Sequence, residues 1–319
     1  MIDILTQKNG RLERLKQVEK GCWVNIYPPF DRSQLEDFAS QNNVPIDFLT
    51  DSLDTDERSR YESEEEIDLV VVNTPVRNEA FVKDEALYIT IPIGIISTPD
   101  FIITISSFKN PVIDDFLHGR IKMLKVEDQQ WFTLRLLDRN VHYFQYYLKE
   151  INTKRYTFES EIYRSSRNRD LKNLLDLQKS LVYFVTNLRA NDLMMNRMRR
   201  TNFLKIQGNE EQDDFLEDII IDNGQASEMA DIYTNIVNSM MDAFASIISN
   251  NLGRTVQRLT VITIVLTLPM VIASFYGMNI ALPMQEAGQT SLWPFWTLLG
   301  ISVILPLFFW LYFRRKRWF

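Results

Sequence analysis

The sequence predicts a small α/β domain, then long helices, then two C-terminal helices that cross a membrane. Two late apolar runs are long enough to span a bilayer, no proline lies between Pro111 and Pro269, and β-like runs alternate with polar segments before Pro111. The predicted divisions are an α/β domain (1–111), a helical region (112–212), a stalk helix (213–258), a first membrane helix (259–276), an outer loop (277–291), a second membrane helix (292–313) and a basic tail (314–319).

The composition limits the classes of protein to which the chain can belong. Its 319 residues are 45% hydrophobic and 24% charged, which is enough apolar material for a sizeable core. The net charge of −7 argues against binding to nucleic acid. The one cysteine, Cys22, cannot form an internal disulfide, and this indicates a reducing compartment. We find no phosphate-binding glycine loop, nucleophile elbow or histidine–carboxylate cluster, so we do not expect an enzyme.

The region before Pro111 has the alternation of strand-like and helix-like segments that is typical of an α/β domain. Charged residues interrupt the first 17 residues, so this segment is not a signal peptide and we expect the N-terminus in the cytoplasm. The acidic run 62–68 is interpreted as a solvated face or loop, and Asp31 or Ser33 as the N-cap of a short helix. Predicted strands, rich in valine, isoleucine and aromatic residues, are 22–27, 67–73, 85–97 and 100–106, and predicted helices are 31–41 and 44–53.

Long helices are predicted after Pro111, because only four glycines interrupt the sequence before Pro269. Connections are expected near 154–156 and 207–212. From Asp213 an apolar seam begins that only Asp222 breaks. The seam suits either a helical hairpin within one subunit or an oligomeric stalk, and we favour the stalk because the same helix enters the membrane. The seam residues are Phe215, Ile219, Ala226, Met229, Tyr233, Ile236, Met240, Ala243 and Ile247.

Two apolar runs, 259–276 and 292–313, contain no charged residue. Both are long enough to cross a hydrocarbon core of about 30 Å, so we expect membrane helices rather than two buried helices of a soluble protein. Arginines precede the first run and follow the second, whereas the connection 277–291 has neither lysine nor arginine. The positive-inside rule therefore predicts both termini in the cytoplasm and the connection outside. The flanking residues are Arg254, Arg258, Trp293, Trp296, Trp310, Tyr312, Arg314, Arg315, Lys316 and Arg317.

The first membrane run carries its polar side chains on one face. Thr260, Thr263, Thr267 and Ser274 are separated by three, four and seven residues, spacings that keep them on one stripe of a helix. Threonines in a membrane helix often bond only to their own backbone, but a stripe suits a wall that faces water or other copies of the helix. Two helices cannot enclose a pore, so conduction would require a ring of subunits.

The end of this run carries the sequence YGMN, at 276–279. The chain resembles the CorA family of divalent-cation channels over essentially its whole length. Besides the motif, the shared features are Pro269 inside the first membrane helix, a short outer loop, the basic segment 314–318 with its tryptophan, and an α/β domain before a long stalk. The resemblance implies a funnel-shaped homopentamer, with the stalk and first membrane helices around a central pore, and Mg²⁺ as the expected substrate.

The resemblance also assigns roles to residues of the motif and the pore. Asn279 would present a ring of carboxamides to hydrated Mg²⁺, Gly277 would permit the backbone turn that presents it, and Met278 would pack beneath. Tyr276 completes the signature. The predicted pore-lining residues are Val256, Leu259, Thr263, Thr267 and Met270, with Val256 and Leu259 forming a hydrophobic constriction.

In the family, acidic residues between subunits bind regulatory Mg²⁺. Asp218 occupies the matching stalk position, with Glu217 and Asp222 nearby, and the partner on the α/β domain would be Asp84 or Glu85. The alternative is that these are ordinary surface acids.

The substrate leaves a second reading open. The outer loop, IALPMQEAGQTS, has Glu286 as its only acid, and a zinc-transporting branch shares the motif, so Zn²⁺ is the alternative, with Co²⁺ and Ni²⁺ as further candidates. The only two histidines, His118 and His142, and the lack of a cysteine pair disfavour a dedicated zinc site. A membrane-anchored sensor or scaffold that conducts nothing is the alternative from another class.

Overall fold

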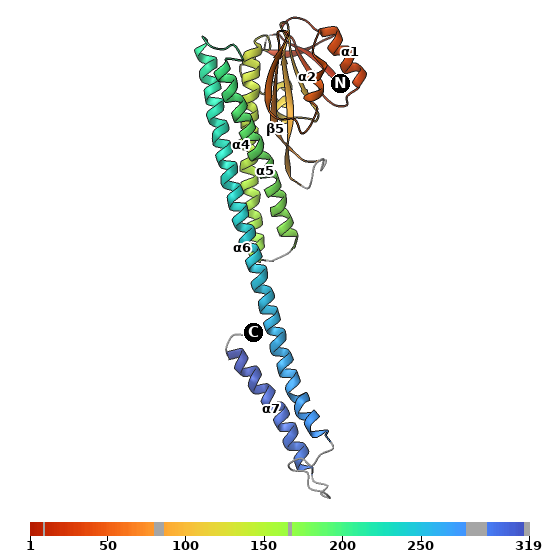
Figure 1. The fold of residues 1–319 in the computed structure, drawn as a ribbon, viewed down its shortest axis with the longest axis vertical. Helices are drawn as coiled ribbons and strands as arrows, with labels where there is room; N and C mark the ends of the chain where they lie inside the picture. The colour runs from red at the N-terminus through yellow and green to blue at the C-terminus, as the bar shows by residue number, and fades with distance from the viewer. Residues whose placement is uncertain (9, 80–85, 165–167, 279–291, 316–319) are drawn as a thin grey trace. The chain divides into compact units, whose positions relative to one another are not determined.

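The computed structural model describes residues 1–8, 10–79, 86–164, 168–278 and 292–315. The chain divides into two compact units, Met1–Met241 and Asp242–Phe319. The first contains a mixed α/β domain and helices packed beside it, and the second contains two apolar helices (Figure 1).

A seven-stranded sheet forms the centre of the α/β domain, in the order β2-β1-β3-β7-β6-β5-β4. Only the β3–β7 pair is parallel, and the other neighbours are antiparallel. The strands are β1 (Ile2–Lys8), β2 (Arg11–Leu15), β3 (Trp23–Ile26), β4 (Arg60–Glu64), β5 (Ile67–Arg77), β6 (Tyr88–Ser97) and β7 (Ile102–Ser106).

Helices cover both faces of the sheet, which explains why its central strands are apolar at successive positions. Along β5, Leu69 and Val71 belong to a core with α1 (Arg32–Asn42) and α2 (Ile46–Asp51). Val70 and Val72, which point to the opposite face, pack with α3 (Pro111–Leu117) and α4 (Gln129–Arg164). The α/β domain is therefore a three-layer structure with α4 lying along one face of the sheet.

Three helices pack together in the first unit: α4, α5 (Asn168–Thr201) and the start of α6 (Glu210–Tyr276). Asn223 on α6 donates from Nδ2 to the carbonyl of Leu188 at 3.0 Å, and Arg189 on α5 pairs with Asp231 at 2.8 Å. The buried positions of α6 in this unit are Gln212, Leu216, Ile219, Asn223, Ala226, Ala230 and Val237.

The seam of α6 is thus only partly the one predicted. Ile219 and Ala226 are buried as expected, but the polar residue within the buried stripe is Asn223, and Asp222 is exposed. Over this part of the helix the seam packs against helices of the same subunit, as the intrasubunit alternative required. The cause is that α4 and α5 flank α6 here and select the face that becomes buried.

Three strands, β1, β2 and β4, were not predicted, and one expected connection is wrong. The N-terminal segment forms β1 and β2. The acidic run 62–68 is solvated as predicted over residues 62–66, which are exposed on the end of β4 and on the turn into β5, where Glu65 and Glu66 have positive φ. No connection occurs at 154–156, because α4 continues to Arg164. Arg155 stabilises that stretch as helix: it lies over the ring of Tyr156 and pairs with Glu159 one turn on.

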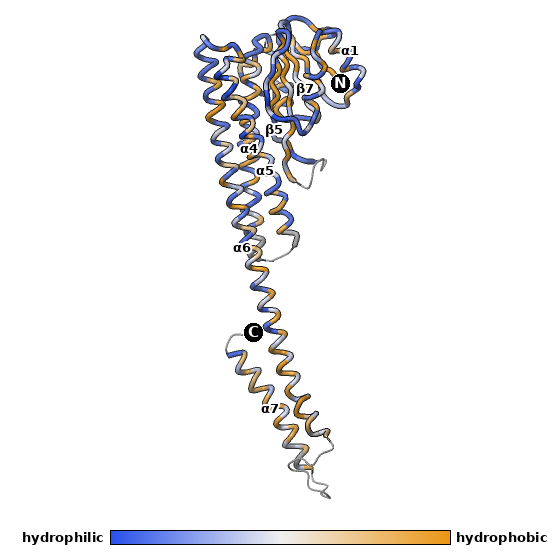
Figure 2. Tube along the Cα trace, in the orientation of Figure 1, coloured by the Kyte–Doolittle hydropathy of each residue, from blue (hydrophilic) through white to orange (hydrophobic). Residues whose placement is uncertain are grey.

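The second unit confirms the predicted apolar helices. The helix α7 (Trp293–Arg315) and part of α6 are each long and apolar enough to cross a membrane (Figure 2). In each helix, only 6% of an apolar stretch of 18 residues is buried within the chain. The helix α6 continues without a break through 67 residues, about 100 Å at 1.5 Å per residue. Pro269 lies inside this helix and Pro306 inside α7.

Candidate ion-conduction site

The signature motif lies where α6 ends. The N–H of Gly277 donates to the carbonyls of Ala273 at 3.0 Å and Ser274 at 3.2 Å, and the N–H of Met278 donates to Phe275 at 3.3 Å. These bonds tighten the last turn and place Met278, which is about half exposed, directly beyond the helix end. Asn279 lies outside the described residues.

Gly277 does not adopt the conformation that we expected to explain it. Its φ lies outside the left-handed region, and a Cβ built there would lie 3.5 Å from the carbonyl oxygen of Ser274, an ordinary contact. A backbone turn therefore does not require glycine at this position within one chain.

The predicted pore-lining residues are open to their surroundings in a single subunit. Val256, Leu259 and Met270 are exposed to 54, 63 and 69%. The hydroxyls of Thr263 and Thr267 each donate at 2.9 Å to the carbonyl four residues earlier, so they have oxygen lone pairs left to accept bonds. Other faces of the segment are open too, as expected for a helix that contacts lipid and other copies.

The acidic residues at the start of α6 separate into two groups. Asp213 and Glu217 both pair with Arg199, at 3.1 and 2.8 Å. Asp218 and Asp222 are exposed one turn apart, and no ion pair to either occurs within the described residues. Arg199 therefore neutralises one face of the helix and leaves the other acidic.

The predicted partners Asp84 and Glu85 lie outside the described residues. Within the parts of the chain that the structure describes, no three histidine, cysteine or acidic side chains gather as a metal site. One subunit therefore does not by itself bring the predicted regulatory ligands together in those parts.

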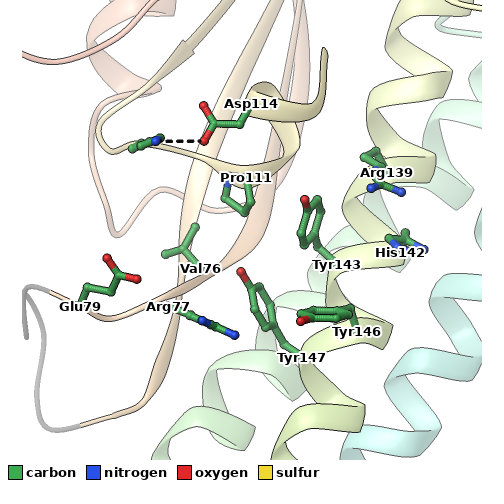
Figure 3. Close-up of a pocket in the computed structure, with 11 residues that line it drawn as sticks. Val76, Arg77, Glu79, Pro111, Asp114, Arg139, His142, Tyr143, Tyr146 and Tyr147 are labelled. Carbon is green, nitrogen blue, oxygen red and sulfur yellow. Dashed lines mark ion pairs between the residues drawn. The ribbon is translucent and has the colours of Figure 1, made fainter. Parts of the chain in front are cut away.

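Three tyrosines, at 143, 146 and 147, are not among the residues predicted from the sequence. Their spacing of three and four residues, which places side chains on one face of a helix, could have indicated them. In the structure they line a pocket on α4 together with basic side chains (Figure 3).

Known proteins resemble the chain over most of its length. The sequence profile of the family described as CorA-like Mg²⁺ transporter protein matches residues 18–315. The cobalt/magnesium transport protein CorA of Methanocaldococcus jannaschii is 25% identical over 310 residues, 93% of this chain and 90% of the relative.

Solved structures share the fold. The complete structure of the CorA magnesium transporter from Methanocaldococcus jannaschii superposes with a TM-score of 0.80 at 23% identity, over 100% of this chain and 99% of the other. The cytoplasmic domain of ZntB from Vibrio parahaemolyticus superposes with a TM-score of 0.59 at 12% identity, over 78% of this chain and 98% of that domain. The matched family segment includes the α/β domain from residue 18 onward, the long helix and both apolar helices, so the chain belongs to the CorA-like Mg²⁺ transporter family.

Proposed function

We propose that this protein is a homopentameric channel that carries Mg²⁺ across the cell membrane. The observation that carries the proposal is the position of the YGMN motif, at the end of the long helix α6 and inside the segment matched by the family. A relative named as a cobalt/magnesium transport protein supports Mg²⁺, with Co²⁺ as a second ion.

Selection would occur on the hydrated ion. Mg²⁺ holds its water shell tightly and dehydrates reluctantly. A ring of five Asn279 carboxamides would accept hydrogen bonds from those waters without removing them, so the ion could bind and still leave. Gly277 would let neighbouring subunits approach at the mouth, where a side chain on each would widen the ring.

The proposed topology places both termini in the cytoplasm and the 277–291 connection outside, because arginines flank the two helices only on the opposite side. Membrane lipid would surround α7. Arg314 lies 5.3 Å from the ring centre of Trp310 near the end of that helix, a pair suited to the headgroup region.

Val256 and Leu259 would form the narrow apolar part of the pore, with Thr263, Thr267 and Met270 further along it. A charge hydrates such a constriction, so Leu259→Asp is expected to raise the resting Mg²⁺ leak in proteoliposomes. If Leu259 faced lipid or α7 instead, the charge would impair insertion by about 2.5–3.5 kcal/mol.

Ile264 provides the control, since it lies five residues on and about 140° around the helix. Ile264→Asp should lower the yield of assembled protein and should not produce a leak. Normal assembly of Leu259→Asp with no leak would place Leu259 away from the pore.

Regulatory Mg²⁺ would bind between subunits, to Asp218 and Asp222 of one subunit and to the acid at 84 or 85 of its neighbour. Because the bound ion stabilises the closed ring, a high internal Mg²⁺ concentration would favour the closed state by mass action. Asp218→Ala should conduct normally but require about fivefold or more internal Mg²⁺ for half-inhibition. The exposed acid Glu228, on the same helix, is the control position, and Glu228→Ala should be inhibited as the unaltered protein is. Unchanged inhibition of Asp218→Ala would remove Asp218 from the regulatory site.

Zinc transport is the second candidate. It is favoured by the outer loop with its single acid Glu286, whereas the likeness to the ZntB domain concerns the fold alone. A dedicated Zn²⁺ site takes nitrogen and sulfur ligands, and the chain has two histidines and one cysteine. This chemistry favours Mg²⁺.

The deciding experiment is flux in proteoliposomes with Mg²⁺, Co²⁺, Ni²⁺ and Zn²⁺ compared, with and without a pH gradient. We expect Mg²⁺ and Co²⁺ flux that does not require the gradient. Proton-coupled Zn²⁺ movement without Mg²⁺ flux would establish the zinc alternative. If correctly assembled protein conducts none of these ions, the result would support the alternative of a membrane-anchored sensor or scaffold.

A further inference from the structure

A pocket of about 520 Å³ lies between the sheet and the helix α4 in the first unit (Figure 3). Arg77 and Glu79, at and just after the end of β5, line one side, and Lys109 and Asp114, around the start of α3, line another. The helix α4 supplies the third side. The volume of the pocket is in the range of small-molecule sites, about 300–1,000 Å³.

The α4 side is an aromatic wall. Tyr143 and Tyr147 extend from the helix towards β5, with Tyr146 beside them (Figure 3). The ring centres lie 5.3 Å apart for Tyr146 and Tyr147 and 5.9 Å apart for Tyr143 and Tyr147. Tyr146 is 49% exposed, so part of its ring is open to a ligand. Such rings stack on or pack edge-on against another planar ring.

The phenols of Tyr143 and Tyr147 have raised pKa values. Burial raises the pKa of Tyr143 to about 12, and the hydrogen bond that it donates to Asp115 adds to the shift. Burial also raises the pKa of Tyr147 to about 12. Burial and the neighbouring Arg139 lower the pKa of the His142 imidazole.

The opposite sides are rich in donors. Arg77 gives one N–H to Glu150 at 2.9 Å, and its side chain is still 48% exposed, so further N–H groups are available. Lys109 lies 3.5 Å from Asp114, and its side chain is 84% exposed. Arg139 lines the pocket as well, and its Nε is bound to Asp115 at 2.6 Å.

This chemistry selects the class of ligand. Two carboxylates line the pocket, those of Glu79 and Asp114, and three cations stand beside them, which disfavours a metal ion. Arginine and lysine bind phosphate and carboxylate oxygens, whereas the tyrosines offer apolar ring area. A ligand that uses both has an anionic end and a planar ring.

We propose that this pocket binds an organic anion with a planar ring, of the nucleotide class, with its ring against Tyr146 and Tyr147 and its phosphates at Arg77 and Lys109. The site lies wholly in the first unit and does not depend on the proposed transport of Mg²⁺.

Isothermal titration calorimetry on the full-length protein in detergent tests this, with ATP as the probe, in EDTA and at fixed excess Mg²⁺. We expect saturable binding, with adenosine and inorganic tripolyphosphate each at least tenfold weaker than ATP. Tyr146→Ala and Lys109→Ala should each weaken ATP binding about tenfold or more.

Two matched control variants test whether a loss of ATP binding comes from the pocket itself rather than from the removal of any exposed positive charge or aromatic ring. Lys20 has the same 84% side-chain exposure as Lys109 and lies 3.4 Å from Asp100, away from the pocket. Tyr156 is an exposed tyrosine on α4 that does not line it. Lys20→Ala and Tyr156→Ala should bind ATP as the unaltered protein does. Equal losses in these controls, tripolyphosphate binding as tightly as ATP, or no saturable binding at millimolar ATP would each overturn the proposal.

Discussion

Replacing Asn279 with alanine is expected to abolish Mg²⁺ flux while the oligomer still assembles. Alanine keeps the backbone beyond the end of α6 but removes the carboxamide oxygens, so a hydrated cation would meet a wider, apolar ring that cannot hold its waters. Flux through Asn279→Ala is measured with a magnesium-sensitive dye inside liposomes, and assembly by size-exclusion chromatography of the same preparation. Asn235→Ala, at an exposed asparagine of α6 in the first unit, should conduct normally.

The aspartate variant tests the chemistry rather than the shape. Asn279→Asp keeps the size of the side chain but adds one negative charge per subunit, which should bind divalent ions too tightly and slow their release. Hexaamminecobalt(III), a stand-in for hydrated Mg²⁺ that does not exchange its ligands readily, should block the unaltered protein from outside. Unimpaired flux through Asn279→Ala would remove the claim that this asparagine is the outer ion site.

The membrane helices could be predicted from sequence because their cause is local. A run without charge, such as 292–313, is long enough by itself to specify a helix in a bilayer, and the structure has α7 over nearly the same residues. The motif at 276–279 was recognised by its resemblance to a family signature at the end of such a run, and the roles of its residues stay a prediction.

The missed strands depend on distant partners. In β2, Leu12 and Leu15 are separated by charged residues, and the strand exists because it pairs with β1, which in turn pairs with β3. The edge strand β4 is polar because one of its sides faces no neighbouring strand. Charge patterns of this kind are typical of edge strands and of loops alike, so the sequence of the segment does not distinguish them.

The buried faces of the helices and the pocket could not be predicted from the sequence, because they too depend on partners that are distant in the chain. Ala226 and Ala230 are buried in α6 because α4 and α5 lie against them, and small residues permit that approach. The pocket joins Arg77 to Tyr147, which are 70 residues apart in sequence (147 − 77). Which residues share a site is therefore decided by the packing of α4 on the sheet.

Removing the carboxylate of Asp115 is expected to destabilise the first unit strongly. Asp115 on α3 is 1% exposed and accepts hydrogen bonds from Arg139 Nε at 2.6 Å, Tyr143 Oη at 2.8 Å and Arg120 Nη1 at 3.0 Å. Breaking a buried ion pair leaves a charge without compensation, which costs about 3–5 kcal/mol. Since Arg120 is largely exposed, we expect about 3 kcal/mol for Asp115→Ala. In a unit of this size that lowers the unfolding midpoint by about 6–12 °C.

The pH dependence identifies the charge as the cause. Burial alone would raise the pKa of Asp115, but the hydrogen bonds from Tyr143, Arg139 and Arg120 outweigh it and lower the pKa below its ordinary value. A lowered folded-state pKa gives stability that is present above the unfolded value of about 3.9 and is lost as the pH falls through the folded value.

Thermal unfolding of the full-length protein in detergent, followed by circular dichroism from about pH 7 down to about pH 3, therefore separates the charge from the shape of Asp115. Asp115→Asn keeps the shape, and its stability deficit should stay constant above about pH 5 and shrink as the acid in the unaltered protein is protonated. Asp100→Ala breaks the exposed pair with Lys20 and should cost less than about 1 kcal/mol at any pH. A deficit of Asp115→Asn that does not change down to acid unfolding would mean that packing around Asp115, rather than its charge, holds α3 to α4.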